Sequence, residues 1–399
     1  MLKYSIDRRH WLVIAFICIG IFSVHLLARP RTWVFDYTLA SMQASMCTII
    51  LCPVIAGYAS AAYSPHMRSS NPLNALSLKK YRSYFVELIG ISTPFLCYFF
   101  VFYIIMLAMC TNKVPLSDFT PADLLPIISA SAFIITSASI GLAFGLHHAS
   151  DYLGPIIAVV VFGIYIALYG STLRILVQTG GATGTLVGYE PNILYHLLQI
   201  GCHICIIFVA SAFAIPNRAK VTVTFRMLSC VLFLLIIVLS HQTELKYSRN
   251  NIDFRLASSL PSITCKSTEN LHVCVGIGYK EFLNKSAQRL QSTYTQLHNE
   301  FPTIAWSTDW AQDGAGQESS PFGVFHDDEG LANNAQDFMN ALVSPQCDFN
   351  KIQQYWTDAY QYFYELEQKA MKDTDRNRSI SHEVAEHALI EISRCSSRP

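Results

Sequence analysis

The chain has 399 residues, of which 52% are hydrophobic and 14% are charged, and its mean hydropathy is +0.31. Soluble domains carry about 25% charged residues, so this composition argues against a wholly soluble protein. The net charge of zero hides two halves of opposite sign: residues 1–241 hold 14 basic and 7 acidic residues, whereas residues 242–399 hold 14 basic and 21 acidic residues. This balance gives no sign of nucleic-acid binding, and it predicts two domains.

Seven stretches of the first half are long and apolar enough to cross a bilayer as helices, because a crossing takes roughly 20 mainly apolar residues. The first follows two arginines, as a signal peptide would. It runs into Arg-Pro-Arg at 29–31 instead of a cleavage site, which predicts a retained helix. The second is rich in small residues and contains Pro53, a composition that suits contact between helices. The predicted spans are 11–28, 38–62, 86–109, 124–146, 154–177, 193–215 and 222–240.

Lys and Arg in the loops predict the orientation of these spans. The N-terminus and the loops on its side carry 10 of these residues, and the opposite loops carry 4. Because positive loops face the cytoplasm, the N-terminus is predicted to be cytoplasmic. An odd number of spans then puts the C-terminal half outside, and one span more or fewer would reverse this. We expect a multi-pass plasma-membrane protein with a transmembrane domain at 1–241, a linker at 242–260 and an extracytoplasmic domain at 261–399.

The cysteines divide between the two halves in a way that fits this topology. Eight of the twelve lie in or beside the apolar spans, where a thiol behaves as a small apolar side chain. The other four lie in the C-terminal half, and an even number in an exported domain predicts disulfides. Four cysteines allow three pairings. We favour Cys265 with Cys274, which flank a hairpin-like stretch, and Cys347 with Cys395 across the last helices.

The C-terminal half has the pattern of a small α+β domain. Strand-like runs surround Cys265 and Cys274, and apolar periodicity predicts helices over 280–300, 330–343, 349–372 and 379–395. Residues 307–320 are rich in Gly, Ser, Gln and acidic side chains, so we expect a loop there. The predicted fold is an all-α transmembrane bundle of about seven helices, followed by a small α+β extracytoplasmic domain.

The segment SHEVAEH contains the residues most reminiscent of a metal site. A zinc peptidase helix needs two histidines four residues apart, with Glu directly after the first. Here His382 and His387 are five apart, about 140° around a helix, so their rings diverge. Glu383, His387 and Glu391 do share one face, as they also would on a solvated helix. We treat these three as weak metal candidates and predict no metal and no cofactor.

Other candidate ligands fit simpler roles. Residues 326–329 read His-Asp-Asp-Glu but lack the alternating ligands of a calcium loop, and they can supply acid to the start of a helix. Cys202 and Cys205 form a Cys-x-x-Cys pair around His203, and His196 lies on the same helical face. Because this pair sits inside an apolar span, the interpretation is packing or interhelical hydrogen bonding. No Walker A sequence and no Gly-x-Ser-x-Gly elbow occurs, so we predict that the chain is not an enzyme.

Residues 37–215 contain three features in succession: a small-residue span ending AGYASAAY, a basic loop and a helix–turn–helix stretch. The loop and the stretch read SPHMRSSNPLNALSLKKYRSYF and SIGLAFGLHHASDYLGPIIAVVVFGIYIALYG. Together they resemble the membrane subunit of ABC-2-type exporters, in the divergent form found in actinobacteria. The C-terminal half, with its VCVGIGY motif, is similar to extracytoplasmic domains appended to some of those proteins. The resemblance implies six core spans, so a seventh that carries an exported domain is a departure.

The resemblance also implies a partner. The 63–82 loop would carry a short coupling helix that docks on a separate cytoplasmic ATP-binding subunit, with Arg68, Lys79, Lys80 and Arg82 near the contact. Ordinary positive-inside bias explains the same four basic residues equally well.

Three functions follow from these observations. The leading hypothesis is a permease-like subunit of an ABC-type exporter, acting in the bilayer as a dimer or heterodimer. The alternative is a membrane-anchored extracytoplasmic receptor or immunity protein. The third is a membrane-bound metallopeptidase using His382, Glu383, Glu386 and His387.

Overall fold

The computed structural model divides the chain into two compact units. The helical unit comprises Met1–Thr183 and Tyr189–Arg255, and the mixed unit comprises Gly184–Gly188 and Leu256–Pro399. The sequence-based prediction instead assigns residues 184–188 to the transmembrane domain. The residues that the structure describes are 8–28, 31–63, 77–148, 152–169, 171, 173–177, 186–214, 220–246, 254–257, 261–312, 315, 319–322, 331–343, 347, 349–372 and 380–395.

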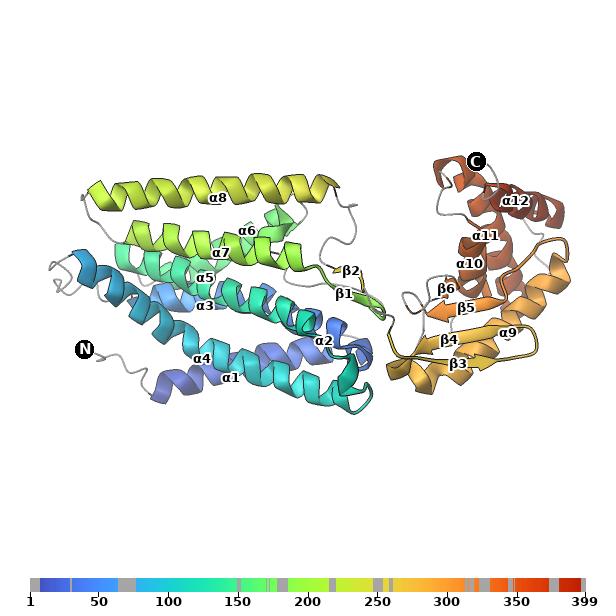
Figure 1. The fold of residues 1–399 in the computed structure, drawn as a ribbon, viewed down its shortest axis with the longest axis horizontal. Coiled ribbons are helices and arrows are strands. Elements are labelled where there is room, and N and C mark those ends of the chain that lie inside the picture. Colours follow the sequence, from blue (N-terminus) through green and yellow to red (C-terminus); the bar gives the residue numbers. More distant parts are fainter. Residues whose placement is uncertain are drawn as a thin grey trace. The chain divides into compact units, whose positions relative to one another are not determined.

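The helical unit is a bundle of apolar helices (Figure 1). Its elements are α1 (Arg8–Leu27), α2 (Tyr37–Met46), α3 (Thr48–Tyr63), α4 (Ser77–Thr111), α5 (Leu125–His147), α6 (Leu153–Tyr169), α7 (Ile193–Ala214) and α8 (Lys220–Lys246). Short 3₁₀ turns at Arg31–Phe35, Leu116–Asp118, Pro121–Leu124 and Arg174–Leu176 connect some of them.

Four helical segments among the described residues are long and apolar enough to cross a membrane. They are Tyr37–Tyr63, Tyr84–Thr111, Pro121–His147 and Ile193–Ala214. Trp11–Leu27, Leu153–Tyr169 and Cys230–Leu239 are shorter apolar helices. Large apolar side chains stand on the outside of the bundle, including Phe16 (82% exposed) and Val159 (71% exposed). Water would leave such a surface unfavourably exposed, whereas lipid chains would cover it, so the bundle has the character of a membrane protein.

The third predicted span is longer in the structure, where α4 begins at Ser77 instead of 86, and two other spans are broken or end early. The second is broken at Cys47 into α2 and α3, and there Ser45 and Thr48 donate their hydroxyls to the carbonyls of Met42 and Ser45. Such bonds compete with the regular helix pattern and bend it. The fifth ends at Tyr169 instead of 177, because the N–H and hydroxyl of Ser171 both bond the Leu168 carbonyl in a turn.

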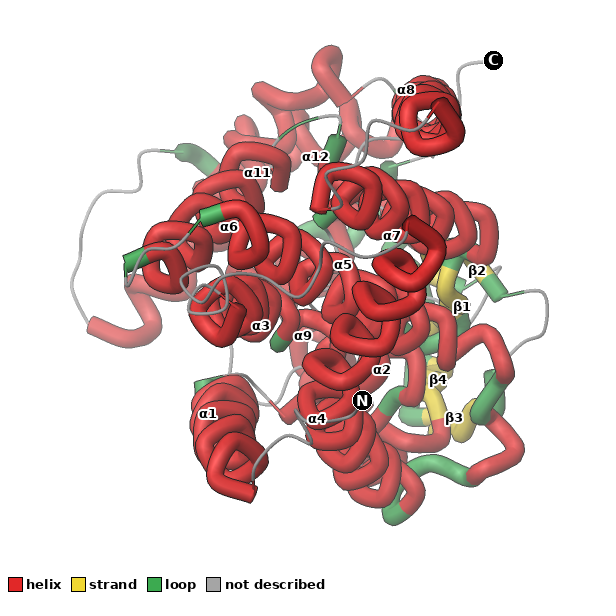
Figure 2. The backbone as a smooth tube through the Cα atoms, turned by 90° about the vertical axis from the view of Figure 1, so that its left-hand side faces the viewer, coloured by secondary structure: helices red, strands yellow, loops and turns green. Residues whose placement is uncertain are grey.

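Small residues let α3, α5 and α6 approach unusually closely. A methyl group added at Gly141 of α5 would lie 2.1 Å from the carbonyl oxygen of Ala56, and one at Gly57 of α3 would lie 2.7 Å from that of Gly154 in α6. Because glycine has no side chain, the two helix backbones come close enough to gain van der Waals contact, and such packing drives helix association in lipid. Figure 2 shows α5 within the bundle, where it contacts α3 on one side and α7 on another.

The mixed unit has a four-stranded sheet with helices packed on it. β3 (Ile263–Ser267) pairs antiparallel with β4 (His272–Gly276), and β5 (Asp309–Gln312) and β6 (Ser320–Phe322) continue the sheet in parallel. The helices are α9 (Leu283–Glu300), α10 (Leu331–Leu342), α11 (Phe349–Lys372) and α12 (His382–Arg394). Their bounds agree closely with the predicted ones. α9 packs on β3 and β4, and Trp310, Phe338 and Phe363 lie in the core.

The loop predicted at 307–320 is wrong. β5 and the start of β6 fall there, and Trp310 and Ala311 of β5 are buried. A strand of four residues is too short to display an alternating pattern, and its hydrogen-bond partners come from β4, far away in the sequence. Composition alone therefore could not reveal it.

A segment between α6 and α7 is part of the mixed unit. Leu186 and Val187 are buried, and a methyl group added at Gly276 of β4 would lie 2.8 Å from Val187 Cγ1. The N–H of Ala257 donates to the Gly188 carbonyl at 2.8 Å. The mixed unit is thus joined to the bundle at both ends of this segment as well as after α8. The pair of strands β1 (Tyr189–Pro191) and β2 (Phe254–Leu256) lies beside these junctions.

The close approach of α5 and α3 leads to a prediction for the stability of a Gly141 variant. Gly141→Ala should destabilise the protein by about 1–3 kcal/mol, because the new methyl group meets the Ala56 backbone and forces the helices apart. The measurement is the thermal melting of the purified protein in detergent. Gly163→Ala in α6 is the matched control, since nothing lies within 4 Å of its added methyl group. Equal melting temperatures for the two variants would contradict the prediction.

Candidate functional site

The interior of the helical unit is unusually polar. A polar side chain inside a membrane bundle is costly, and such residues commonly mark a functional pathway or a binding site. Here they lie on, or directly before, α2, α3, α4, α5 and α7, which makes the interior the first candidate for a functional site. The buried polar side chains are Asp36, Thr38, Ser41, Gln43, Ser45, Thr48, Ser60, Ser92, Asp123, Ser129, Thr136, Ser137, Ser139, Asn192, His196, Gln199, His203 and Ser211.

One group of these side chains ties together the starts of three helices. Thr38 Oγ1 donates to Asp123 Oδ1 at 2.6 Å and lies 3.3 Å from the carbonyl oxygen of Tyr189. The N–H and the hydroxyl of Thr120 donate to Asp123 Oδ2 at 2.7 and 2.9 Å. Both carboxylate oxygens of Asp123 thus accept hydrogen bonds. Together with Thr38, Asp123 holds the starts of α2 and α5 and the strand before α7 at one end of the bundle. Its role is structural.

A second group forms a polar seam between α5 and α7. His196, Gln199 and His203 share one face of α7 at helical spacing. Ser129 Oγ lies 3.0 Å from His196 Nδ1, and Gln199 Nε2 donates to the Ile175 carbonyl at 2.8 Å. Interhelical hydrogen bonding, which the sequence predicts for these histidines, is therefore found at His196.

His203 differs from His196. Its side chain is completely buried and its ring stacks on Phe133 at 5.0 Å between centroids. Within the described residues neither Nδ1 nor Nε2 has a hydrogen-bond partner. A buried polar atom almost always has a partner, and leaving one without it costs about 1–3 kcal/mol. His203 therefore packs through the face of its ring, and His196 Nε2, Ser60 Oγ and Ser92 Oγ are likewise without a partner among the described residues.

His203 lies on the wall of an apolar cavity of about 360 Å³. The cavity runs between α5, α6, α7 and α8. Its wall consists of Phe133, Thr136, Ser137, Ile140, Phe144, Ile157, Val160, Val161, Ile164, Tyr165, Leu168, Leu176, Val177, His203, Ile206, Val209 and Phe233.

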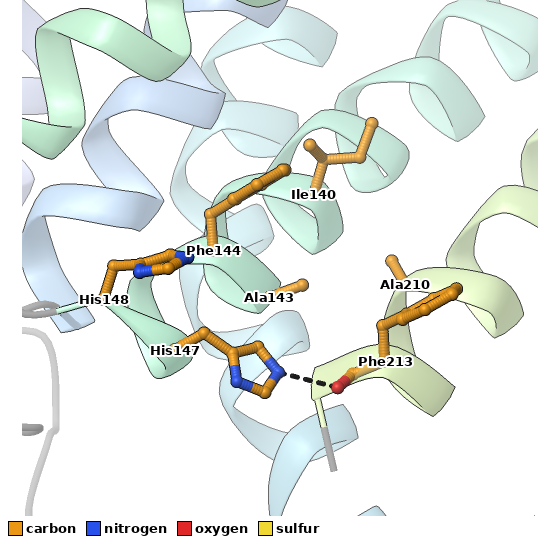
Figure 3. Close-up of a pocket in the computed structure, with 7 residues that line it drawn as sticks. All are labelled: Ile140, Ala143, Phe144, His147, His148, Ala210 and Phe213. Atoms are coloured by element: carbon orange, nitrogen blue, oxygen red, sulfur yellow. Dashed lines mark hydrogen bonds between the residues drawn. The ribbon is translucent and has the colours of Figure 1, made fainter. Parts of the chain in front are cut away.

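A second cavity, of about 270 Å³, lies at the end of α5 (Figure 3). Ile140 and Phe144 line both cavities, so the two spaces follow one side of α5. His147 Nε2 lies 2.7 Å from the Phe213 carbonyl and closes the end of α5 onto α7. His148 lines the same space. The predicted span 124–146 ends just before these two histidines, and α5 ends at His147.

The basic residues of the 63–82 loop fall partly outside the described residues. Residues 64–76, which include Arg68, are outside the described residues. Lys79, Lys80 and Arg82 belong to the first turns of α4, which begins at Ser77, ahead of its apolar span at Tyr84. The second half of the predicted loop is therefore helical and continuous with a membrane-length helix.

The weak metal candidates do not assemble a site. Glu383, His387 and Glu391 lie on α12, where Glu391 pairs with Arg394 at 2.7 Å and the His387 ring packs near Tyr355. Among the described residues, Cys265, His272 and Cys274 are the group whose ligand atoms lie close enough together to hold a metal ion. The two cysteines there are joined in a disulfide, so their thiolates cannot bind a metal.

The remaining residues of the peptidase hypothesis make structural contacts. The His382 ring stacks on Phe301 at 4.7 Å, and its Nε2 lies 2.9 Å from the Glu300 carbonyl. Glu386 accepts a hydrogen bond from Thr303 at 2.8 Å. These contacts hold α12 onto the end of α9 and point the two histidines to different neighbours.

The four cysteines of the mixed unit form two disulfides with the favoured pairing. Cys265 and Cys274 are directly opposite in the β3–β4 pair, and Cys347 is joined to Cys395 at the end of α12. All twelve cysteines are among the described residues, and the eight of the helical unit form no disulfide. The prediction from cysteine number and position is confirmed.

Comparisons with protein families, curated proteins and solved structures found nothing that matches this chain. Its function has to be inferred from the residues themselves.

The two disulfides should differ in strength. Joining residues 48 apart restricts the unfolded chain more than joining residues 9 apart, and chain entropy assigns about 4 and about 2.6 kcal/mol to them. Replacing Cys347 and Cys395 by Ser should therefore increase hydrogen exchange in α11 and α12 of the full-length protein more than replacing Cys265 and Cys274. Cys97→Ser, at an exposed thiol of α4, is the control. Alkylation of any of the four thiols before reduction would contradict the pairing.

Proposed function

We propose that this chain is the membrane-embedded permease subunit of an ABC-type exporter, powered by a separate cytoplasmic ATP-binding subunit. The observation that carries the proposal is the polar interior of the bundle. Buried Ser, Thr, Gln and His side chains can hold helices together, but an anchor for an external domain needs few of them, and they are costly in lipid. A pathway for cargo needs them, because polar groups must replace water along it.

The proposed topology has seven crossings: α1, α2 with α3, α4, α5, α6, α7 and α8. The Asp123 contacts support it, since they gather the starts of α2, α5 and α7 at one end. Glu190, just before α7, pairs with Arg255, beyond α8, at 2.7 Å, as an antiparallel pair of crossing helices requires. Together with the basic loops on the proposed cytoplasmic side, these contacts support a topology with the mixed unit outside the cell.

The turn at Cys47 is a tightened helical turn, because Cys47 keeps right-handed helical angles and the Leu51 N–H still donates to its carbonyl. Tyr37–Tyr63 is therefore one bent, membrane-long helix that is mostly buried inside the bundle. The tight α3–α5–α6 contact would form the rigid body against which the other helices move.

The N-terminal end of α4 is the proposed docking point for the ATPase. At about 1.5 Å per residue the 35 residues of α4 span about 52 Å, well beyond a hydrocarbon core of about 30 Å. Its first turns, with Lys79, Lys80 and Arg82, would therefore project into the cytoplasm as a lever continuous with a spanning helix. The resemblance assigns Arg68 to the same contact. A second copy, or a related subunit, would complete the export path.

The alternative of a membrane-anchored receptor or immunity protein has less support. A passive tether needs one connection to the external domain, whereas here Leu186 and Val187, from between α6 and α7, are buried in the mixed unit. Movement of α6 and α7 would be passed to the mixed unit through this segment of the chain, which suits a transporter better than a passive anchor.

Co-purification tests the ATPase proposal. Tagged protein in mild detergent should retain an ATP-binding subunit, and replacing Lys79, Lys80 and Arg82 by Ala should reduce its yield about tenfold, the equivalent of about 1.4 kcal/mol. Replacement of Arg218, Lys220 and Arg226 by Ala is the matched control, because it removes the same charge from the same proposed side. Protein that purifies without an ATPase would favour the receptor hypothesis, and equal losses in both variants would reject the docking point.

Reporter fusions test the topology. Alkaline phosphatase attached after Pro399 should be active, because seven crossings place that end outside, where its disulfides form. The same enzyme attached in the 215–219 segment should be inactive. The reverse pattern would show that one of the seven helices does not cross.

A further inference from the structure

The Cys265–Cys274 disulfide lies on one face of the sheet, at the sheet's edge. Successive side chains of a strand point to opposite faces, so Cys265 and Lys266 of β3 face opposite sides. Lys266 Nζ donates to Asn284 Oδ1 of α9 at 2.9 Å, which identifies the face that α9 covers. Cys265 points away from α9 and is exposed, and β3 is the outermost strand of the described sheet. A molecule in solution can therefore reach the sulfur of Cys265.

The two sulfur atoms of this disulfide differ in access. A thiolate attacks a disulfide along the line of the S–S bond, from the side opposite to the sulfur that leaves. This bond joins β3 to β4. Beyond Cys265 its line leaves the sheet at the edge, whereas beyond Cys274 it meets β5, where Ala311 is paired with Cys274 and is buried. Cys274 is itself only 6% exposed. Cys265 is therefore the sulfur open to attack, and Cys274 is the sulfur that leaves.

A histidine contacts the sulfur that leaves. His272 and Cys274 are two residues apart in β4 and share a face, and His272 Nε2 lies 3.4 Å from Cys274 Sγ. A disulfide sulfur carries no hydrogen, so the ring nitrogen is the donor in this contact. Ser267, which is paired with His272 across the hairpin, has its Oγ 3.1 Å from Nδ1 and donates to it. The two contacts together fix one tautomer of His272, with the Nε2–H directed at the sulfur.

This N–H favours opening of the disulfide. Exchange is faster when the leaving thiolate is stabilised, and a hydrogen bond to a thiolate is stronger than one to a neutral sulfur because the acceptor is charged. The bond also joins residues only 9 apart, compared with 48 for the second disulfide, so it restricts the unfolded chain less. The paired strands, from Ile263 opposite Gly276 to Ser267 opposite His272, hold the hairpin together when the bond is open.

We propose that Cys265–Cys274 is a thiol–disulfide exchange site whose substrate is a dithiol in solution, and that His272 stabilises the leaving sulfur. A thiolate of the dithiol bonds to Cys265 Sγ, the bond between the two cysteines breaks, and its electron pair stays on Cys274 Sγ, which accepts the hydrogen bond from His272. The second thiol of the dithiol gives its proton to Cys274 and displaces the sulfur of Cys265. Cys265 takes up from water the proton that the first thiol released.

The overall reaction reduces the protein disulfide to two thiols and oxidises the dithiol to a disulfide. The site does not depend on the permease proposal, because a receptor or a transporter could equally contain it.

Reduction of the full-length protein in nanodiscs by dithiothreitol tests the site. The eight free cysteines are alkylated first. Samples taken during the reaction are quenched with acid and alkylated with a second reagent, and mass spectrometry follows both disulfides of the same molecule. Cys265–Cys274 should open at least about tenfold faster than Cys347–Cys395.

Variants separate the hydrogen bond from simple exposure. His272→Phe keeps an aromatic ring that suits a strand but removes the N–H, so opening of Cys265–Cys274 should slow about tenfold. His272→Gln, which keeps an N–H donor, should restore part of the rate. His298→Phe is the matched control, since His298 is also exposed but stacks on Tyr294 within α9. Its rate should equal that of the natural protein.

A second measurement needs no variant, so it decides the matter even if His272→Phe fails to fold. Glutathione, a monothiol, should form its mixed disulfide on Cys265 and leave Cys274 to be alkylated. Trypsin cleaves after Lys266, so the two cysteines fall in different peptides and can be told apart.

Three results would overturn the proposal. Opening of both disulfides at the same rate would mean that the hairpin is not an exchange site. Equal rates for His272→Phe and His298→Phe would exclude His272 from the reaction. Glutathione found mainly on Cys274 would contradict the proposed direction of attack.

Discussion

The contact between α3 and α5 is the constraint on which the rest of the bundle depends. In lipid, helices gain no hydrophobic free energy from meeting, so they associate by close packing and by polar bonds. At Gly141 the α5 backbone lies against the Ala56 carbonyl with no room for a methyl group. This fixes α5 against α3, and α5 then presents Ser129, Phe133 and Thr136 toward α7. The polar seam and the cavity exist because of that placement.

Sequence patterns revealed what depends on local composition. Apolar stretches located the helices of the bundle, and helical periodicity located α9 to α12 within a few residues. Cysteine parity, together with the hairpin-like stretch around Cys265 and Cys274, gave the disulfide pairing. Each of these signals is carried by neighbouring residues or by a simple count, so it survives without knowledge of the tertiary contacts.

What the sequence did not reveal depends on partners far along the chain. β5 exists because β4 supplies its hydrogen bonds, and the break at Cys47 depends on hydroxyls that turn back to the backbone. The burial of Val187 in the mixed unit required Gly276, nearly ninety positions later. One signal was available and overlooked: Thr-x-x-Asp at 120–123 has the spacing of a capping box, and Asp123 does bond back to Thr120.

The two buried histidines of α7 show how one helix face can be held by two kinds of contact. They lie on the same face, and α5 meets each with a different residue. At His196 the contact is Ser129, whose hydroxyl forms a hydrogen bond at 3.0 Å. At His203 the contact is Phe133, one helical turn further along α5, which stacks on the imidazole ring and forms no hydrogen bond with its nitrogens. A phenyl ring covers the face of the imidazole and leaves the two nitrogens directed elsewhere. Ser129 bonds only the Nδ1 atom of His196, so α5 provides a hydrogen bond at one histidine and ring stacking at the other.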